Sequence, residues 1–488
     1  MIVDSKVKLE GMDSKIIALT GAALMTFSCA TAKIKPAPEK KKPNIIFILA
    51  DDLGYGDLGY NGGTKIKTPA IDQMAKDGIV FKKHYAGSTV CGPSRACLMT
   101  GLHTGHAPVR ENPAWTKSGK PADLSSRDVT VAKELQRAGY KTGVIGKWGL
   151  AEKLDEGMPL KQGFDYFYGF CKHKAAHHYY PEEIWENDKK IKLEGNVLKE
   201  KKGTYSEDLF IDKALDFIDT NKNKPFFLYF ATTLPHYELT IPEKEKEYYY
   251  KQNWPLRKMK PGNYLHDENG FVTYAAMVSR MDKDVAAIRK KLKELNIDEN
   301  TIVIFTSDNG HEFDRVNDEF LNSNGNFRGK KRDLYEGGVH VPFVACWPGK
   351  IKPGSSTEHI SSFWDFLPTA CDIAGIKPST NTDGISYFPS LIGKEGKQQK
   401  HDYLYWEFNE RRGPIQAILK DNWKLVHFVG KKYELFNLLE DPSENNDLIS
   451  VNPKKAEELK AIMATARTEH PEFPLEPHAR LSKKNKKK

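Results

Sequence analysis

The chain alternates continuous apolar runs of strand length with longer segments that carry helical periodicity. The apolar runs cover residues 44–50, 141–146, 225–231 and 301–306, and the helical segments cover residues 68–76, 130–138, 207–221 and 271–295. Thr68 is expected to cap the first of these helices, with Pro69 at its first position. A continuous apolar run is typical of a strand buried on both faces. The alternation therefore predicts an α/β fold, with a mostly parallel central sheet flanked by helices.

The pattern changes near residue 400, where short strands separated by turn residues replace the longer elements. These strands cover residues 403–408, 415–419, 424–428 and 433–437, and a helical segment follows at 453–467. Short strands with turns between them favour an antiparallel sheet. We therefore expect a catalytic domain at 43–400, a small C-terminal antiparallel α+β subdomain at 401–475 and a basic tail at 476–488.

The N-terminal segment resembles a signal for export. Lys15 precedes an apolar run at 16–27, which is too short to span a bilayer and has the length of a signal core. Cys29 after this run resembles a bacterial lipoprotein signal, whereas Ala30-Thr31-Ala32 offers a site for ordinary signal peptidase. Residues 1–32 are thus expected to be a signal peptide and residues 33–42 a Lys/Pro-rich tether. The protein is expected in the periplasm or as an outer-membrane lipoprotein anchored at Cys29.

Charge and cysteine content narrow the function classes. The formal net charge is +9, and part of it lies in the Lys-rich ends at 40–42 and 483–488. The remaining excess fits an anionic substrate, and no nucleic-acid-binding module is recognisable, so no nucleic acid partner is expected. The six cysteines are widely spread without a C-x-x-C pair, which argues against a zinc site and a dense disulfide framework.

Polar side chains follow each of the four predicted strands. Asp51 and Asp52 follow the first strand, Lys147 the second, His236 the third, and Asp308 with Asn309 the fourth. The carboxyl edge of an open α/β sheet is where a ligand crevice forms. Either acidic pair alone would also fit a turn. Together, the oxygen donors of Asp51, Asp52, Asp308 and Asn309 indicate a site for Ca²⁺ or Mg²⁺.

Cys91 is expected at the start of a helix. Pro93 and Ser94 are residues typical of a helix start, and the backbone N–H groups there favour anions. Arg95 adds a fixed positive fork beside it. The segment therefore predicts an anion-binding position around Cys91, although a lone cysteine is more commonly a buried small hydrophobe.

These motifs resemble those of the type I sulfatases, the arylsulfatase family of the alkaline phosphatase superfamily. The resemblance runs from about residue 43 to 450 and is carried by blocks in the family's order. The blocks are Asn44 to Gly56, C-x-P-S-R at 91–95 followed by A-x-L-x-T-G at 96–101, Gly146-Lys147-Trp148, Pro235-His236, Ser307 to Gly310, Tyr335 to Gly338, Trp347-Pro348-Gly349, and the segment from Tyr433 to Pro442.

The resemblance implies that Cys91 is oxidised to Cα-formylglycine by a sulfatase-maturating enzyme and acts as a hydrated nucleophile. Ca²⁺ is implied between Asp51, Asp52, Asp308, Asn309 and the modified Cys91. Arg95 would hold the diol, Lys147 and Lys331 would clamp sulfate, His236 would protonate the leaving oxygen, and Asp308 would take the nucleophile's proton. The implied reaction is hydrolysis of a sulfate ester by covalent catalysis.

Two positions depart from the family pattern. Many members carry a histidine two residues after the lysine that corresponds to Lys147, where this chain has Gly149. His311, His177 and His106 are the candidates to replace it. The second departure is His340, which stands where the family usually has arginine, and we expect this change to be structural.

One aromatic segment bears on the identity of the substrate. The aromatic segment at 164–181 looks like that of bacterial carbohydrate sulfatases, and stacked rings suit sugar faces. We expect a sulfated galactose or N-acetylgalactosamine unit, with His177 contributing to its binding. Two alternatives stay open, namely a phosphonate or phosphate monoester hydrolase of the same superfamily and a non-catalytic anion-binding lipoprotein in which Cys91 is never oxidised.

Overall fold

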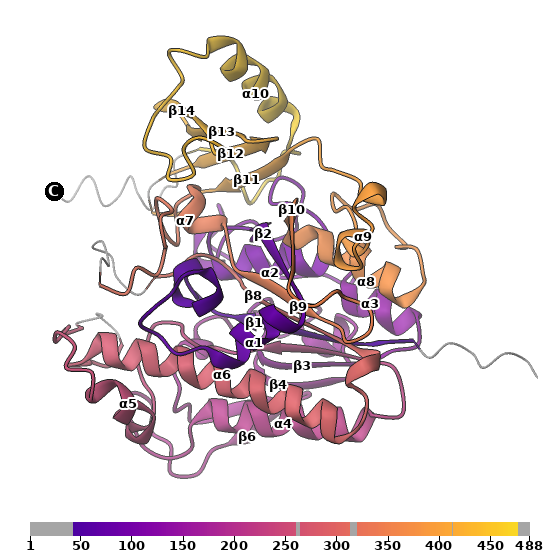
Figure 1. Ribbon diagram of the computed structural model, residues 1–488, viewed down its shortest axis with the longest axis vertical. Coiled ribbons are helices and arrows are strands. Elements are labelled where there is room, and N and C mark those ends of the chain that lie inside the picture. Colours follow the sequence, from indigo (N-terminus) through magenta and orange to yellow (C-terminus); the bar gives the residue numbers. More distant parts are fainter. Residues whose placement is uncertain (1–41, 260–263, 313–319, 412, 477–488) are drawn as a thin grey trace, which may run out of the picture. The chain divides into compact units, whose positions relative to one another are not determined.

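The computed structural model describes residues 42–259, 264–312, 320–411 and 413–476. The expected signal peptide with Cys29, the tether up to residue 41 and the basic tail from residue 477 lie outside these residues. The described residues belong to one compact unit that contains a large sheet, its flanking helices and a smaller sheet (Figure 1). Within them, no helix combines the length and the apolar character needed to cross a membrane.

The central sheet has ten strands in the order β10-β2-β9-β8-β1-β7-β3-β4-β5-β6. They are β1 Asn44–Ala50, β2 Ile79–Tyr85, β3 Lys141–Lys147, β4 Tyr166–Phe170, β5 Glu183–Glu186, β6 Lys189–Lys192, β7 Phe226–Ala231, β8 Thr301–Ser307, β9 Phe343–Cys346 and β10 Ser355–Ser362. The five strands from β8 to β4 are mutually parallel, whereas β9 runs antiparallel to both neighbours and β5 and β6 form an antiparallel hairpin. The predicted mostly parallel sheet is confirmed.

Helices cover both faces of this sheet. They are α1 Pro69–Asp77, α2 Cys91–Thr100, α3 Val131–Arg137, α4 Ser206–Asn221, α5 Glu247–Tyr250, α6 Gly270–Glu294, α7 Glu336–Val339, α8 Phe366–Ala374 and α9 Phe388–Leu391. Alternate residues of β1 point to opposite layers, because side chains alternate along a strand. Ile46 and Ile48 pack with α1, α4 and α6, and Phe47 packs with α2, α3 and α8. This is why the run at 44–50 is apolar throughout.

The start of α1 differs from the sequence prediction. Thr68 occupies the cap position with Pro69 after it, but the Thr68 hydroxyl donates to Asp72 Oδ1 at 3.1 Å. The N–H groups of Ala70 and Ile71, which have no acceptor within the helix, donate instead to the carboxylate of Asp282 in α6 at 3.0 and 2.8 Å. A carboxylate interacts favourably with the positive end of a helix, so a distant residue has taken over the capping role.

The second sheet is antiparallel, as predicted, with the order β11-β12-β13-β14. Its strands are β11 Leu404–Phe408, β12 Ile415–Lys420, β13 Trp423–Phe428 and β14 Lys432–Asn437, and α10 Pro453–Thr465 packs on it. Trp406 Nε1 donates to the carbonyl of Ala86 at 2.9 Å, and buried Lys424 pairs with Glu336 and Glu444 at 2.8 and 3.1 Å. The two sheets are thus joined by buried polar contacts as well as apolar packing.

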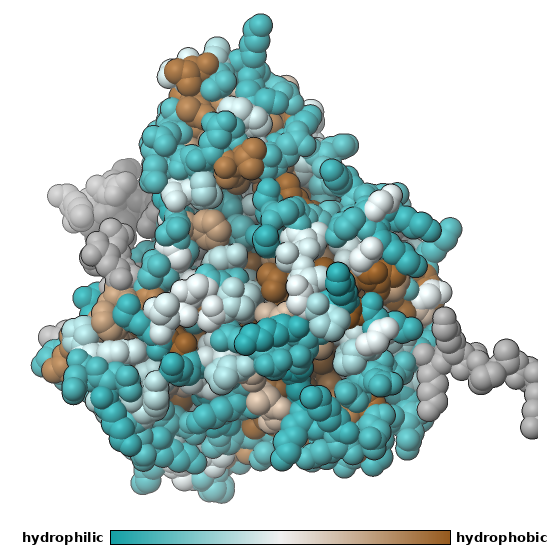
Figure 2. Space-filling model, viewed as in Figure 1, coloured by the Kyte–Doolittle hydropathy of each residue, from teal (hydrophilic) through white to brown (hydrophobic). Residues whose placement is uncertain are grey.

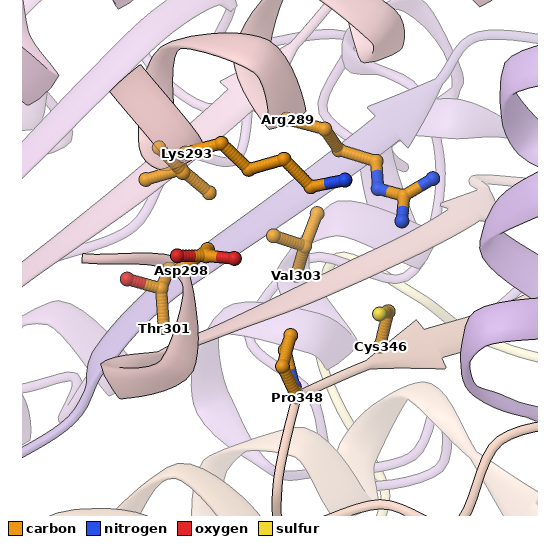
Figure 3. A pocket seen from close by; sticks show the side chains of 8 residues that line it. Arg289, Lys293, Asp298, Thr301, Val303, Cys346 and Pro348 are labelled. Carbon is orange, nitrogen blue, oxygen red and sulfur yellow. The ribbon is translucent and has the colours of Figure 1, made fainter. Parts of the chain in front are cut away.

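The face seen in Figure 2 is mostly hydrophilic, with hydrophobic residues scattered over it. One small pocket of roughly 20 Å³ lies between α6 and the sheet, lined among others by Arg289, Lys293, Thr301 and Cys346 (Figure 3). Thr301 begins β8, so this pocket lies at the amino edge of the parallel strands. The predicted polar cluster lies at the opposite, carboxyl edge.

Candidate active site

Two adjacent strand ends bring the predicted acidic residues together. β1 and β8 are parallel neighbours in which Ala50 pairs with Ser307, so the residues that follow both strands lie side by side. The Asp52 N–H donates to Asp308 Oδ1 at 3.1 Å, and Asn309 Nδ2 donates to Asp52 Oδ1 at 2.8 Å. Asp52 has a left-handed backbone, with φ at 63°, which turns the chain immediately after β1.

The acidic cluster, meaning Asp51, Asp52, Asp308 and Asn309, has the donor set of a hard-cation site. All four residues are almost fully buried. Asp51 Oδ1 and Asn309 Oδ1 are buried oxygens without a hydrogen-bond partner among the described residues. Such oxygens are costly unless a ligand satisfies them. Oxygen donors suit Ca²⁺ or Mg²⁺, so the cluster fits a divalent cation of this kind.

Three cations surround the cluster. Lys147 Nζ lies 2.6 Å from Asp51 Oδ2, and Lys331 Nζ lies 2.7 Å from Asp52 Oδ2. Arg95 donates through Nε and Nη2 to Asp308 Oδ2 at 3.1 and 2.8 Å. Burial opposes ionisation of Asp51, but Lys147 and the neighbouring cations hold its pKa well below the usual range. Burial and the nearby Asp51 carboxylate raise the pKa of Asp308 to about 7, although Arg95 opposes this.

Cys91 is the first residue of α2, and every residue of this helix is buried. Ser94 fixes the start of the helix, because its hydroxyl accepts from the Gly87 N–H at 3.1 Å and donates to the Asp308 carbonyl at 2.6 Å. Burial raises the pKa of the Cys91 thiol to about 11, against the opposing effect of Lys147 and Lys331. The thiol is therefore neutral at physiological pH and a poor nucleophile as it stands.

His236 and His177 complete one side of the site. His236 Nε2 lies 3.5 Å from Asp52 Oδ2, and its ring stacks on that of His177 with 4.3 Å between centroids. The Tyr264 hydroxyl contacts His177 Nδ1 at 2.7 Å. Burial lowers the pKa of His236 to about 4, with Asp51 and Asp52 pulling in the opposite direction. His177 and His236, both expected from the sequence to bind substrate, thus lie side by side.

His173 is a site residue that sequence reasoning missed. Its Nδ1 lies 3.5 Å from Cys91 Sγ and its Nε2 lies 3.9 Å away. His173 follows β4, and β4 was not predicted because its aromatic residues were interpreted as sugar contacts. The ligand crevice lies at the carboxyl ends of parallel strands. Had residues 166–170 been predicted as a strand, His173 would have been a candidate, because β4 is the parallel neighbour of β3.

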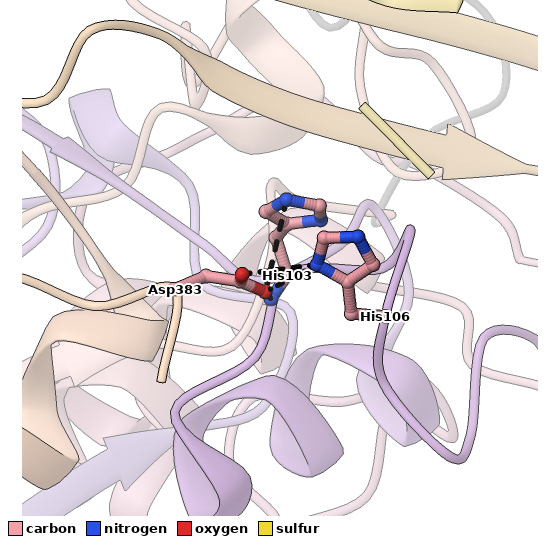
Figure 4. A group of neighbouring side chains, drawn as sticks. All are labelled: His103, His106 and Asp383. Carbon is pink, nitrogen blue, oxygen red and sulfur yellow. Dashed lines mark hydrogen bonds and ion pairs between the residues drawn. The ribbon is translucent and has the colours of Figure 1, made fainter. Parts of the chain in front are cut away.

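The other proposed replacements for the missing histidine lie in different surroundings. His106 Nδ1 pairs with Asp383 at 2.9 Å, and its ring stacks on His103 (Figure 4). The Gly105 N–H donates to His103 Nδ1 at 3.1 Å, so the proton of a neutral His103 ring resides on Nε2, which favours a hydrogen-bonded cluster over a metal site. His311 is buried near Asp52, and burial lowers its pKa to about 4.

His340 has the surroundings of a structural residue. Its Nδ1 contacts Glu336 Oε2 at 2.8 Å, and its Nε2 contacts the Lys82 carbonyl at 2.8 Å. Its ring stacks on Phe327, with 4.5 Å between centroids. Both ring nitrogens are thus occupied by the protein itself, in keeping with the expected structural role.

Comparison with known proteins identifies the family. Residues 43–376 match the family described as Sulfatase, and residues 325–469 match one described as N-sulphoglucosamine sulphohydrolase, C-terminal. The first match covers more than half of the 488 residues and includes the acidic cluster and Cys91. The chain belongs to the sulfatase family. It is therefore a hydrolase of sulfate esters, as the resemblance of its motifs implied.

This sulfatase is similar to known relatives over most of its length. It is 30% identical to N-acetylgalactosamine-6-sulfatase of Mus musculus, over 80% of this chain and 74% of the relative. It is 28% identical to N-acetylgalactosamine-6-O-sulfatase of Bacteroides thetaiotaomicron, over 92% of this chain and 98% of the relative. The crystal structure of Ps i-CgsB in complex with k-i-k-neocarrahexaose superposes with a TM-score of 0.74 at 28% identity, covering 89% of this chain and 95% of that one. The family match over residues 325–469 includes the C-terminal sheet.

Proposed function

We propose that this sulfatase releases sulfate from a sulfated saccharide, with Cys91 converted to formylglycine and Ca²⁺ bound in the acidic cluster. The observation that carries the proposal is the position of Cys91. It stands at a buried helix start, with its thiol and carboxylate oxygens of Asp51 and Asp308 all within 4.8 Å of one another. Arg95, Lys147 and Lys331 add three positive charges to the same space.

The charge balance supports a cation and an anionic substrate bound together. Asp51, Asp52 and Asp308 pair with Arg95, Lys147 and Lys331. Lys331 also pairs with Glu312 at 3.0 Å, and Glu312 pairs with Arg332, so four carboxylates face four cations. A divalent cation held by the acidic cluster would leave a positive excess that a sulfate monoester offsets. When bound, Ca²⁺ would orient the nucleophile and neutralise charge on the sulfate oxygens.

The neutral, buried thiol of Cys91 supports its conversion to another group. A hydrated formylglycine supplies a hydroxyl nucleophile and a second hydroxyl through which the bound sulfate is expelled. Because Cys91 is fully buried, a maturating enzyme must reach it before α2 packs into the fold. We therefore propose such an enzyme as a partner that acts on the unfolded chain.

The remaining side chains have separate roles around the ester. Lys147 and Lys331 bind the sulfate oxygens, and Arg95 holds the nucleophile through its position between Asp308 and the Lys147 carbonyl. Asp308, with a carboxylate oxygen within 4.8 Å of Cys91 Sγ, accepts the nucleophile's proton. His236 donates a proton to the leaving oxygen, and the bound sulfate anion favours its protonated form.

The proposed substrate unit is a sulfated galactose or N-acetylgalactosamine. Two relatives named above act on N-acetylgalactosamine 6-sulfate by their names, and a solved neighbour is in complex with k-i-k-neocarrahexaose. The rings of Tyr264, Tyr237 and His177 lie next to one another beside His236, which suits a sugar face. We further propose export to the periplasm or to the outer membrane with a lipid anchor at Cys29, on the signal-like segment at 15–32.

A comparison of two preparations tests the proposal. The chain is produced with and without a maturating enzyme, and the peptide that contains Cys91 is weighed for the change from CH₂SH to CHO. Both samples are then incubated with a panel of sulfated monosaccharides and oligosaccharides and with a phenyl phosphonate monoester. We expect the aldehyde form alone to release sulfate from a galactose-type unit. Equal activity without the aldehyde, or faster phosphonate than sulfate hydrolysis, would contradict the proposal.

A further inference from the structure

Gly149 lies beside Lys147 and Arg95, two of the cations around the acidic cluster. Its backbone is left-handed, with φ at 76°, and a Cβ at this position would lie 3.9 Å from Lys147 Cε and 4.0 Å from Arg95 Cδ. A side chain at 149 would thus point among the groups that surround Cys91. The family resemblance places a histidine there, and this chain has none at that position.

A histidine stands instead beyond the end of the neighbouring strand. β3 and β4 are parallel, and their pairing continues past both strand ends, because the Gly149 N–H donates to the Cys171 carbonyl at 3.1 Å. His173 follows Cys171 by two residues. Its backbone N–H donates to Glu152 Oε1 at 2.6 Å, which ties the loop after β4 to the loop after β3. The two loops therefore lie next to each other at the carboxyl edge of the sheet.

The ring of His173 faces the nucleophile directly. Its Nδ1 and Nε2 lie 3.5 and 3.9 Å from Cys91 Sγ, the atom that stands in for the oxygens of a hydrated formylglycine. The ring is partly buried and meets the His177 ring edge-on, with 4.8 Å between centroids and 77° between planes. This packing holds the imidazole with its nitrogen-bearing edge toward residue 91.

We propose that His173 holds a hydroxyl of the hydrated formylglycine by a hydrogen bond and replaces the histidine missing at Gly149; the proposal rests on the proposed function of Cys91. The unprotonated nitrogen of a neutral imidazole accepts a hydrogen bond from the hydroxyl and leaves the oxygen lone pairs free to face sulfur. The same bond favours the hydrate over the aldehyde. In this chain the positioning histidine thus lies in the loop after β4, whereas the family pattern has it in the loop after β3.

His177 has a different position in this ring cluster. Its Nδ1 contacts the Tyr264 hydroxyl at 2.7 Å, and its face stacks on His236. These contacts place His177 on the side of the leaving group. The two histidines can therefore be separated experimentally, since only His173 is expected to affect the state of residue 91.

Two variants of the mature enzyme test the inference, with Lys172→Ala as the matched control because Lys172 is exposed and flanks the same loop. His173→Ala removes the ring, and His173→Phe keeps a ring against His177 while removing both nitrogens. The first readout is sulfate release per aldehyde, after the aldehyde content has been measured by peptide mass. The second readout needs no turnover and is the rate at which methoxyamine converts the aldehyde to an oxime.

Both His173 variants are expected to lose about tenfold to a hundredfold in sulfate release, the range of one hydrogen bond to a reacting group. They are also expected to form the oxime several-fold faster, because less of residue 91 is hydrated, while Lys172→Ala matches the parent in both readouts. An unchanged oxime rate, or sulfate release within twofold of the parent, overturns the inference. A parent enzyme that contains no aldehyde overturns the proposed function itself.

Discussion

The Ser94 hydroxyl donates to the backbone carbonyl of Asp308 across 2.6 Å, between residues 214 positions apart in the chain. This bond joins the first turn of α2, which carries Cys91, to the end of β8, which carries Asp308 and Asn309. This bond, together with the two bonds from Arg95 to Asp308, therefore fixes the position of Cys91 relative to Asp308 and Asn309.

Ser94→Ala is expected to lower the free energy of unfolding by about 1–3 kcal/mol, because it leaves the buried Gly87 N–H and the Asp308 carbonyl without their partner. Urea unfolding of the unconverted chain measures this without interference from maturation. Ser356→Ala is the control, since Ser356 is exposed on β10. A loss no larger than that of the control would show that the bond does not hold the helix.

Lys147 and His236 are expected to respond differently to the leaving group. Lys147 pairs with the acidic cluster and faces the sulfate, so Lys147→Ala slows hydrolysis of every ester. His236→Ala slows release from a sugar sulfate by roughly 10²–10⁴-fold more than from nitrophenyl sulfate, since an activated phenol leaves without a proton. Both substrates are assayed on one preparation, normalised to aldehyde content. Equal losses on both esters in His236→Ala would assign the proton donor to another residue.

Removal of Ca²⁺ is expected to abolish sulfate release, and added Ca²⁺ should restore it. Asn309→Ala should lower the bound calcium, because Asn309 Oδ1 is a buried oxygen with no partner among the described residues. Asn381→Ala, at an exposed position, is the control. Elemental analysis accompanies each assay. Full activity in a preparation free of calcium would rule out the proposed role of the acidic cluster.

Stability is expected to fall with rising pH because of His401, which is not part of the acidic cluster. Burial opposes protonation of His401, but Asp365 at 2.7 Å raises the pKa of His401 above its ordinary 6.5. A raised pKa in the folded state stabilises the fold fully below the unfolded value, and this stabilisation is lost as the pH rises through the folded value. Urea midpoints at about pH 6 and pH 9 should therefore differ more for the parent than for His401→Gln. Parallel shifts in both proteins would contradict this assignment.

Much of the fold follows from the sequence because β1, β3, β7 and β8 are apolar throughout and are separated by long helices. The polar residues that follow these four predicted strands, which include Asp51, Lys147, His236 and Asp308, were then recognised as site candidates from the sequence alone. The weaker strands were not predicted, for local reasons. In β2, Lys82 and Lys83 interrupt the apolar pattern, and β5 and β6 have mostly polar sequences in an edge hairpin.

Contacts between distant segments account for the rest. The acceptor for the first turn of α1 is Asp282, which lies more than 200 residues away in the chain. His173 reaches Cys91 only because β4 pairs with β3, and neither fact is visible in local periodicity. The sequence offered His311, His177 and His106 as candidates, whereas the order of the strands brings His173 next to Cys91.

The buried contacts of Trp406 and Lys424 bear on how this enzyme can be engineered. Trp406 bonds to the carbonyl of Ala86, and Lys424 pairs with Glu336 at the start of α7, five residues after Lys331. A chimera that exchanged only the C-terminal sheet for that of another sulfatase would sever both contacts and disturb the segment that presents Lys331. Recombination between such enzymes should instead exchange the sheet together with residues 85–90 and 331–340, as one transplantable block.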